Sequence, residues 1–162
     1  MKNTAKLKCH LTLTLFFFIS FGACNAQEFF NYNNVGSNTP SQLINKGKID
    51  AILNSDSVSF TTNSSASRTT SAAQVNASVN TLEINYSNLN EVNGMQNQNI
   101  KNCIVKITAP VSTINLNVLN HFSKLEVVHV IIETPLITGN IRDLIVMTNS
   151  LVLISYQISI LQ

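Results

Sequence analysis

The chain has 162 residues, of which 44% are hydrophobic and only 11% are charged, and its formal net charge is +2. This length is enough for one ordinary domain with its own core. Because no cluster of basic residues is present to meet phosphates, the composition argues against nucleic-acid binding.

Residues 1–26 have the pattern of a secretory signal peptide. Three lysines precede an uncharged apolar run, residues 11–21, and a run of this length is too short for a membrane-spanning helix, which needs roughly 20 residues. Small residues follow the run, and Ala26 suits the position before a cleavage site. The pattern predicts cleavage between Ala26 and Gln27, and export to the periplasm, the cell surface or the surroundings of a bacterium.

Cys24 supports a second interpretation of this N-terminus. Residues 21–24, Phe-Gly-Ala-Cys, resemble the lipobox that precedes the lipidated cysteine of bacterial lipoproteins. The resemblance implies that Cys24 becomes a lipid-bearing first residue, and two or more acyl chains anchor a protein stably at about 0.8 kcal/mol per buried CH₂. Lipoboxes usually have an aliphatic residue where this chain has Phe21, so simple cleavage is favoured and lipid anchoring is the alternative.

Removal of residues 1–26 changes both the charge and the cysteine count. The remaining chain has seven basic and eight acidic residues, a formal charge of −1, so the basic excess belongs to the signal. Cys103 is the cysteine that remains, which excludes an intramolecular disulfide, and its strand-like surroundings predict a buried, unreactive thiol. We expect no transmembrane helix in the mature chain, because polar residues interrupt its apolar C-terminal run.

The segment 27–53 is predicted to be loosely ordered, with one short helix. Thr39 suits the N-cap, Pro40 the first helical position and Gln42 the partner in a capping box. The helix is expected to end near Gly47, since glycine weakens a helix interior.

Residues 54–80 are dominated by Ser, Thr and Asn. Their apolar content is too low to offset the entropy lost on ordering, so we predict a linker or loop. Together with the segment before it, this region makes a disordered or loop-rich N-terminal third.

Residues 81–162 are predicted to form a β-domain. Apolar and polar residues alternate as in half-buried strands, and Val, Ile and Thr are frequent, which favours strands over helices. Leu125–Ile132 and Leu144–Met147 are apolar on both faces and predict central, doubly covered strands. The last alternating stretch, residues 152–160, is predicted to be a terminal strand, and an exposed edge there would invite pairing, including self-association. Either this strand is covered, or it pairs with another molecule, or the chain is a fragment of a longer product.

The apolar anchors of these strands recur at intervals of roughly 20 residues. They are Leu82, Ile104, Leu125 and Leu144. With the stretch His121–Val130 and Asn149, this spacing resembles that of leucine-rich-repeat proteins and of exported bacterial β-solenoid proteins, and the resemblance implies a repeat-like β-solenoid. Turn signals every 8–12 residues or so fit an antiparallel β-sandwich or meander equally well, so the expected fold class is mainly β with both architectures open.

The titratable residues of this region do not form a preformed catalytic or metal-binding group. In a strand, the Cα atoms of His129 and Glu133 stand roughly 13 Å apart, and Glu126 points to the opposite face from His129. No phosphate-binding loop, nucleophile elbow or zinc motif occurs. We therefore predict no catalytic, cofactor-binding or metal-binding residue, and no cofactor.

These observations predict an exported structural, adhesive or partner-binding domain, whose partner is a protein or a surface glycan. The lack of Trp and the gathering of aromatic residues at Phe29, Phe30 and Tyr32 weaken the case for a sugar-stacking site. Two alternatives stay open. One is a secreted hydrolase whose site assembles from His121, His129 and an acid, and the other is a fragment of a longer exported protein.

Overall fold

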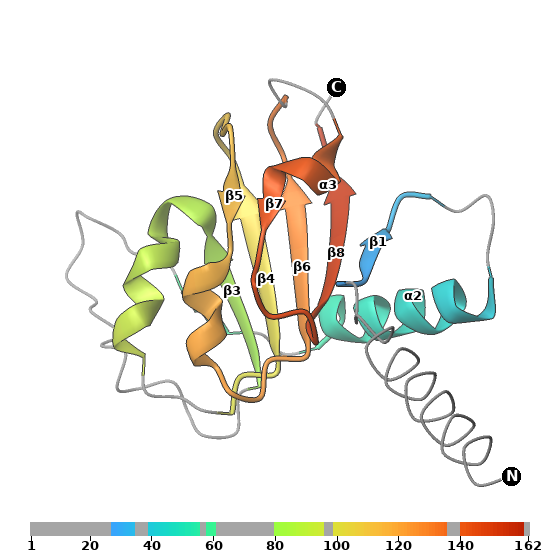
Figure 1. Cartoon of the computed structure of the whole chain (residues 1–162), viewed down its shortest axis with the longest axis horizontal. Helices are drawn as coiled ribbons and strands as arrows, with labels where there is room; N and C mark the ends of the chain where they lie inside the picture. The colour runs from blue at the N-terminus through green and yellow to red at the C-terminus, as the bar shows by residue number, and fades with distance from the viewer. Residues whose placement is uncertain are drawn as a thin grey trace, which may run out of the picture.

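The centre of the molecule is a parallel sheet of six strands in the order β1-β8-β6-β4-β3-β2. The computed structural model describes residues 27–34, 39–55, 58–60, 80–95, 99–135 and 140–160. The strands are β1 (Phe29–Asn31), β2 (Val58–Phe60), β3 (Thr81–Asn85), β4 (Asn102–Ile107), β6 (Val127–Ile132) and β8 (Leu153–Ile158). Figure 1 shows the longer strands side by side, and their arrows point in the same direction.

The register of the sheet aligns one row of core residues across its centre. Leu82, Cys103, Val128 and Ile154 are direct neighbours on β3, β4, β6 and β8, and each is 0% exposed. Because consecutive strands are parallel, the chain must return along a face of the sheet after each one. The return segments supply the second layer of the fold.

One face of the sheet is covered by three short helical elements and a small second sheet. The helical ones are the 3₁₀ helices η2 (Tyr86–Gly94) and η3 (Asn117–His121) and the single-turn helix α3 (Ile141–Leu144). Between them, β5 (Ile114–Asn115) pairs in parallel with β7 (Ile145–Val146). Apolar side chains of these elements, such as Leu89 and Leu119, and Phe122 directly after η3 close the larger hydrophobic core.

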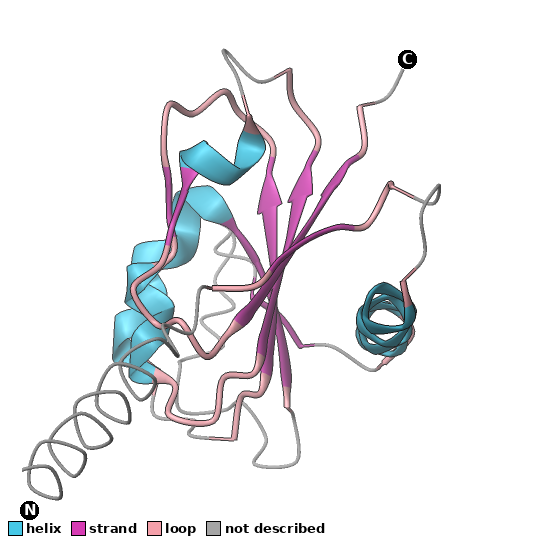
Figure 2. Cartoon of the chain, turned by 45° about the vertical axis from the view of Figure 1, so that its right-hand side comes forward, coloured by secondary structure: helices cyan, strands magenta, loops and turns pink. Residues whose placement is uncertain are grey.

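The opposite face is covered by α2 (Pro40–Leu53). Figure 2 looks along the sheet and shows α2 on one side and the shorter helical segments on the other. Ile49 and Ile52 of α2 pack on Phe30, Val127 and Leu153 in a smaller core. A parallel sheet with helices on both faces is an α/β arrangement.

The predicted fold class, mainly β with either a solenoid or an antiparallel sandwich, is therefore wrong. Every described strand pair is parallel, which rules out the antiparallel architectures, and helical segments cover both faces. Alternation of side chains identifies a strand but not the direction of its neighbour. The 3₁₀ helices escaped prediction because elements this short have no sustained helical periodicity.

The two doubly apolar segments have different outcomes. Leu125–Ile132 contains β6, all six residues of which are buried at the centre of the sheet, as predicted. Leu144–Met147 does not form a central strand: Leu144 ends α3, β7 has two residues, and Val146 is 41% exposed. The predicted regular spacing of strand anchors therefore does not extend to Leu144.

The prediction of a disordered or loop-rich N-terminal third is wrong for the described residues from Gln27 to Ser55. These residues form β1 and α2. The predicted helix start is confirmed, since the backbone N–H of Gln42 donates to Thr39 Oγ1 (3.4 Å) and that of Thr39 donates to Gln42 Oε1 (3.0 Å). The helix runs past Gly47 to Leu53 because Ile49 and Ile52 are buried against the sheet. Most of the predicted linker, residues 61–79, lies outside the described residues.

The last strand, β8, is not an exposed edge. It pairs with β6 on one side and with β1 on the other. Beyond β1, Asn33 continues the pairing with its side chain: Oδ1 accepts from the Ile158 N–H (2.8 Å) and Nδ2 donates to the Ile158 carbonyl (3.3 Å). The N-terminal strand thus covers the edge that sequence alone left open.

Candidate functional site

The residues predicted for processing lie at or before the start of the described chain. Cys24 and Ala26 are outside the described residues. Gln27 is the first described residue, and its Nε2 donates to the carbonyl of Asn149 (3.0 Å), next to the start of β8. Cleavage before Gln27 and lipidation of Cys24 remain predictions.

His129 lies on β6 beneath α2 and is fully buried. Its Nδ1 is 3.1 Å from Ser155 Oγ and its Nε2 is 3.3 Å from Gln157 Oε1, and Tyr32 contacts the ring edge-on at a centroid distance of 5.6 Å. Burial lowers the pKa of His129 to about 4, because a charged ring would lose its hydration. His129 is therefore a neutral, hydrogen-bonded core residue at pH 7.

His121 lies in the layer on the other face of the sheet. It ends η3, and its Nδ1 is 2.7 Å from the Val118 carbonyl, to which it donates. Its ring packs on Phe122, a residue of the larger core, with centroids 3.9 Å apart. His129 shares its face with Val127 and Ile131 of the smaller core, so the structure does not bring the two histidines together.

The acidic residues near these histidines in sequence are exposed. Glu126 pairs with Lys101 (3.1 Å) and is 62% exposed, and Glu133 and Asp143 are also exposed. Cys103 is a free cysteine that is 0% exposed, and burial raises the pKa of its thiol, so its predicted burial is confirmed. Among the described residues, no three His, Cys, Asp or Glu side chains are close enough to hold a metal ion.

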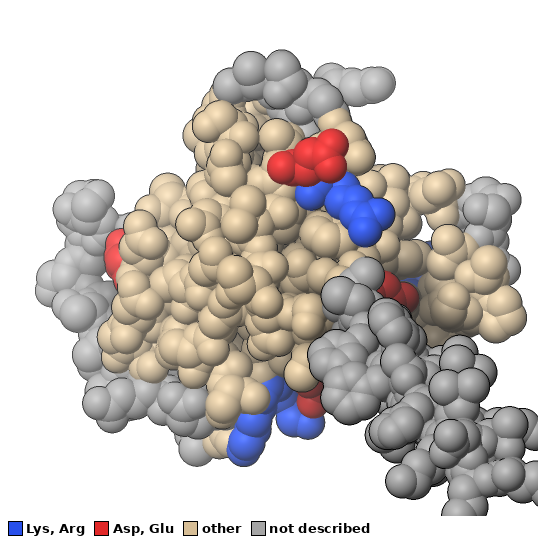
Figure 3. Space-filling view, in the orientation of Figure 1, with Lys and Arg blue, Asp and Glu red and all other residues tan. Residues whose placement is uncertain are grey.

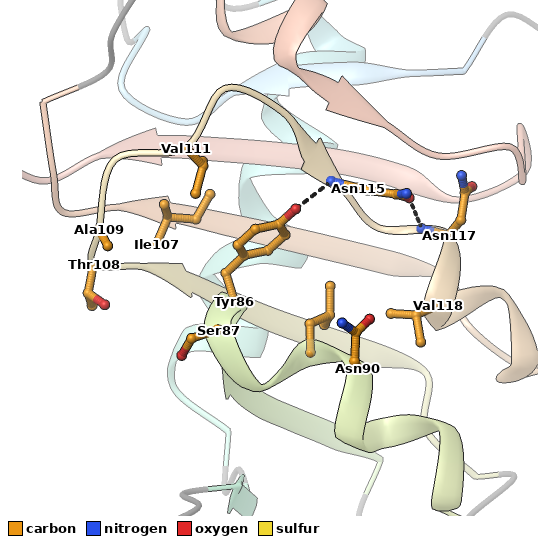
Figure 4. A pocket seen from close by; sticks show the side chains of 11 residues that line it. Tyr86, Ser87, Asn90, Ile107, Thr108, Ala109, Val111, Asn115, Asn117 and Val118 are labelled. Carbon is orange, nitrogen blue, oxygen red and sulfur yellow. Dashed lines mark hydrogen bonds between the residues drawn. The ribbon is translucent and has the colours of Figure 1, made fainter.

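A cleft of about 500 Å³ opens where β3 and β4 end. Tyr86 follows β3 directly and begins η2, whereas Thr108 and Ala109 follow β4. The opposite wall comes from β5 and the start of η3 (Figure 4). We call this the Tyr86 cleft. It lies at the carboxyl ends of parallel strands, which is where ligands bind in open α/β sheets.

The lining of the Tyr86 cleft combines apolar and uncharged polar side chains. The polar ones are Tyr86, Ser87, Asn90, Thr108, Asn115 and Asn117. The apolar ones are Leu89, Ile107, Ala109, Val111 and Val118. None of these 11 residues is charged. Apolar walls with a few polar groups are the usual lining of small-ligand sites.

The hydroxyl of Tyr86 joins the two walls of the cleft. It donates to the Thr113 carbonyl (3.0 Å) and accepts from the Asn115 N–H (2.9 Å). Asn115 Oδ1 in turn accepts from the Asn117 N–H (3.0 Å), which holds the start of η3 (Figure 4). The hydroxyl is thus occupied within the protein, whereas the ring stays in the cleft.

Asn90 and Thr108 supply polar groups that no other described residue uses. Both are exposed, and within the described part of the chain their side chains form no hydrogen bond. They come from different elements beside the cleft, Asn90 from η2 and Thr108 from the loop after β4. Each can therefore donate to or accept from a ligand in the cleft.

A second hollow of about 550 Å³ lies at the opposite edge of the sheet, beside the starts of β6 and β8. Its charged lining residues are Glu28, Lys48 and Glu126. Glu28 already accepts from Asn45 (2.6 Å) and Glu126 pairs with Lys101. Two of its three charged side chains are thus engaged with the protein's own groups.

Charged groups are sparse over the molecule, as Figure 3 shows for one face of the described residues. No helix in the described ranges is long and apolar enough to cross a membrane. The chain matches no protein-family model, no curated protein and no solved structure. The cleft therefore has to be interpreted from its own chemistry.

Sequence reasoning missed the Tyr86 cleft. The predicted alternation of residues in this region gave no role to Tyr86, Asn90 or Thr108. The usable signal was that uncharged polar residues follow two buried strands directly, at Tyr86–Ser87 and at Thr108. That signal points to a site only if the two strands are parallel, so that their carboxyl ends meet at one edge.

Proposed function

We propose that this chain is an exported binding module whose Tyr86 cleft holds an uncharged, hydrogen-bonding ligand. The observation that carries the proposal is the cleft at the carboxyl ends of β3 and β4, which described residues without charge line. Two of them, Asn90 and Thr108, have hydrogen-bonding groups that bond to no other described residue. Its volume of about 500 Å³ is within the usual range for a small-ligand site.

The export part of the proposal is supported by the pattern of residues 1–26, a basic start followed by a short apolar run and small residues. The intact mass and N-terminal sequence of the protein recovered from its own cell test it. A chain that begins at Gln27 supports simple export, and one that begins at a lipid-bearing Cys24 supports an anchored form. A chain that keeps residues 1–26 contradicts cleavage of a signal peptide.

The binding part is tested by thermal unfolding in the presence of uncharged small molecules, namely sugars, polyols, simple amides and neutral peptides. A ligand at 100 times its Kd stabilises a folded protein by about 2.7 kcal/mol. At least one such molecule is expected to raise the Tm of the wild type and to raise that of the Asn90→Ala/Thr108→Val double variant much less. If the same molecules stabilise both proteins equally, or none stabilises either, the proposal is wrong.

A further inference from the structure

The chemistry of the Tyr86 cleft narrows the class of its ligand. We infer that the cleft binds a neutral carbohydrate, which packs on the ring of Tyr86 and forms hydrogen bonds with Asn90 and Thr108. This inference rests on the proposed function and names the ligand class for the same cleft.

The absence of charge in the described lining selects against charged ligands. A phosphate, carboxylate or ammonium group that enters the cleft loses part of its hydration, and none of the 11 lining side chains carries an opposite charge to compensate. Amides and hydroxyls match neutral polar groups instead. The asparagine side chain offers both donors and an acceptor, and the threonine hydroxyl is donor and acceptor at once, as is every hydroxyl of a sugar.

Tyr86 contributes its ring rather than its hydroxyl. The hydroxyl is taken by Thr113 and Asn115, and Figure 4 shows the ring crossing the cleft between Ile107 and Val111 on one side and Asn90 on the other. An aromatic ring is a large apolar surface, and the C–H face of a sugar ring is apolar too. The cleft thus places an apolar platform beside unused polar groups, and a sugar needs both.

The same hydroxyl argues against an extended peptide. A peptide that adds to a strand edge uses the backbone N–H and C=O groups of that edge. At β5, the two groups that face Tyr86 are the Thr113 carbonyl and the Asn115 N–H, and both are already bonded to its hydroxyl. A strand added at this edge finds these two backbone groups already bonded, which favours a ligand that binds through side chains.

The test is a glycan array probed with the full chain, followed by calorimetric titration of the neutral hexose and N-acetylhexosamine oligosaccharides that bind. Sialylated and sulfated glycans and an uncharged Ser/Asn-rich peptide are probed alongside. We expect binding of neutral oligosaccharides only. Asn90→Ala and Thr108→Val should each weaken that binding about tenfold, the effect of one lost hydrogen bond, whereas Asn34→Ala, an exposed asparagine outside the cleft, should leave it unchanged.

Two substitutions at Tyr86 separate its ring from its hydroxyl. Tyr86→Phe keeps the ring but frees the Thr113 carbonyl and the Asn115 N–H that the hydroxyl holds. It should therefore weaken binding less than Tyr86→Ala, which removes the platform and should weaken binding more than about tenfold. If Tyr86→Ala does not fold by circular dichroism, the Asn90, Thr108 and Tyr86→Phe variants decide the test.

The outcomes separate this inference from the proposed function. Peptide binding, or equal binding of acidic glycans, that is weakened by Asn90→Ala overturns the carbohydrate class and leaves a binding cleft. A neutral oligosaccharide whose affinity does not change in the Asn90 and Thr108 variants binds elsewhere and overturns the inference. If no glycan and no uncharged molecule binds, both the inference and the proposed function are wrong.

Discussion

Asparagine side chains stabilise several turns of this molecule. At four positions among the described residues, the side-chain Oδ1 of an asparagine accepts from the backbone N–H two residues further on, at distances of 3.0 to 3.2 Å. The asparagines are Asn31, Asn115, Asn140 and Asn149. This local bond mimics a backbone turn. The many asparagines therefore have a structural role in addition to making the surface polar.

Asn33 has a different role, because its side chain extends the pairing of β1 with β8. Asn33→Ala removes both bonds to the Ile158 backbone and is expected to lower the free energy of unfolding by about 1–2 kcal/mol. Urea unfolding measures this change. Asn34→Ala is the matched control, since Asn34 is exposed and its side chain is expected to contribute less than about 0.5 kcal/mol. Equal effects of the two substitutions would contradict the pairing role.

His129 makes the stability of the fold depend on pH. Its pKa is lowered from 6.5 to about 4 in the folded chain, so between these values the unfolded chain binds a proton that the folded chain does not. The contribution of His129 to the free energy of unfolding is therefore complete above pH 6.5. It is lost as the pH falls toward 4, and the total loss is about 3 kcal/mol.

The measurement is urea unfolding at pH 7 and at pH 4.5 for the wild type and for His129→Asn. The variant loses packing at both pH values. The difference between its free energies of unfolding at pH 7 and at pH 4.5 should nevertheless be smaller than in the wild type, because the titrating group is gone. Carboxylates contribute equally to both proteins and cancel in the comparison. An unchanged difference would show that His129 is not the titrating group.

At the scale of elements, α2 is held on the sheet by a narrow apolar stripe with polar contacts beside it. Ile49 is 0% exposed and Ile52 is 6% exposed. Beside them, the Tyr32 hydroxyl donates to Asp50 Oδ1 (2.6 Å) and Lys46 Nζ bonds to Asp50 Oδ2 (2.9 Å). The hydroxyl and the ammonium lower the pKa of the Asp50 carboxyl. These polar contacts lie near the surface, so the buried apolar stripe supplies most of the free energy that holds α2 on the sheet.

Two identical substitutions on α2 test this assignment. Ile49→Ala leaves a cavity between α2 and the sheet and should lower the free energy of unfolding by about 2–5 kcal/mol. Ile44 is on the same helix but is 61% exposed, so Ile44→Ala should change it by less than about 0.5 kcal/mol. Both are read by urea unfolding, and amide hydrogen exchange should show α2 opening more often in the Ile49 variant alone. Similar effects of both would mean that α2 is attached through its other face.

At the scale of the whole molecule, the sequence predicted local elements better than their arrangement. The start of α2 followed from Thr39, Pro40 and Gln42, and the burial of β6 followed from its unbroken apolar run, because each depends on neighbouring residues only. The pairing of β1 with β8 joins residues that are more than 120 positions apart, and no local pattern encodes it. The Tyr86 cleft was missed for the same reason, since its walls meet only when β3, β4 and β5 are in place.

The sequence predicted that residues 81–162 form a β-domain apart from the segments before it. This division of the chain can be tested directly. In the structure, this segment relies on β1 to pair the free edge of β8 and on α2 to cover the side chains of Val127 and Leu153. A protein of residues 81–162 exposes that edge and that apolar face at once, and exposed edges and apolar patches promote association.

We therefore expect residues 27–162 to unfold in one cooperative thermal transition and to be free of aggregates in light scattering. Residues 81–162 alone should lose the transition or associate. Adding back residues 27–55 as a separate peptide should restore part of the structure, because it supplies the missing strand and helix. If residues 81–162 unfold cooperatively as a monomer with the same midpoint, then β1 and α2 are accessories, and the sheet from β3 to β8 is a domain that is stable on its own.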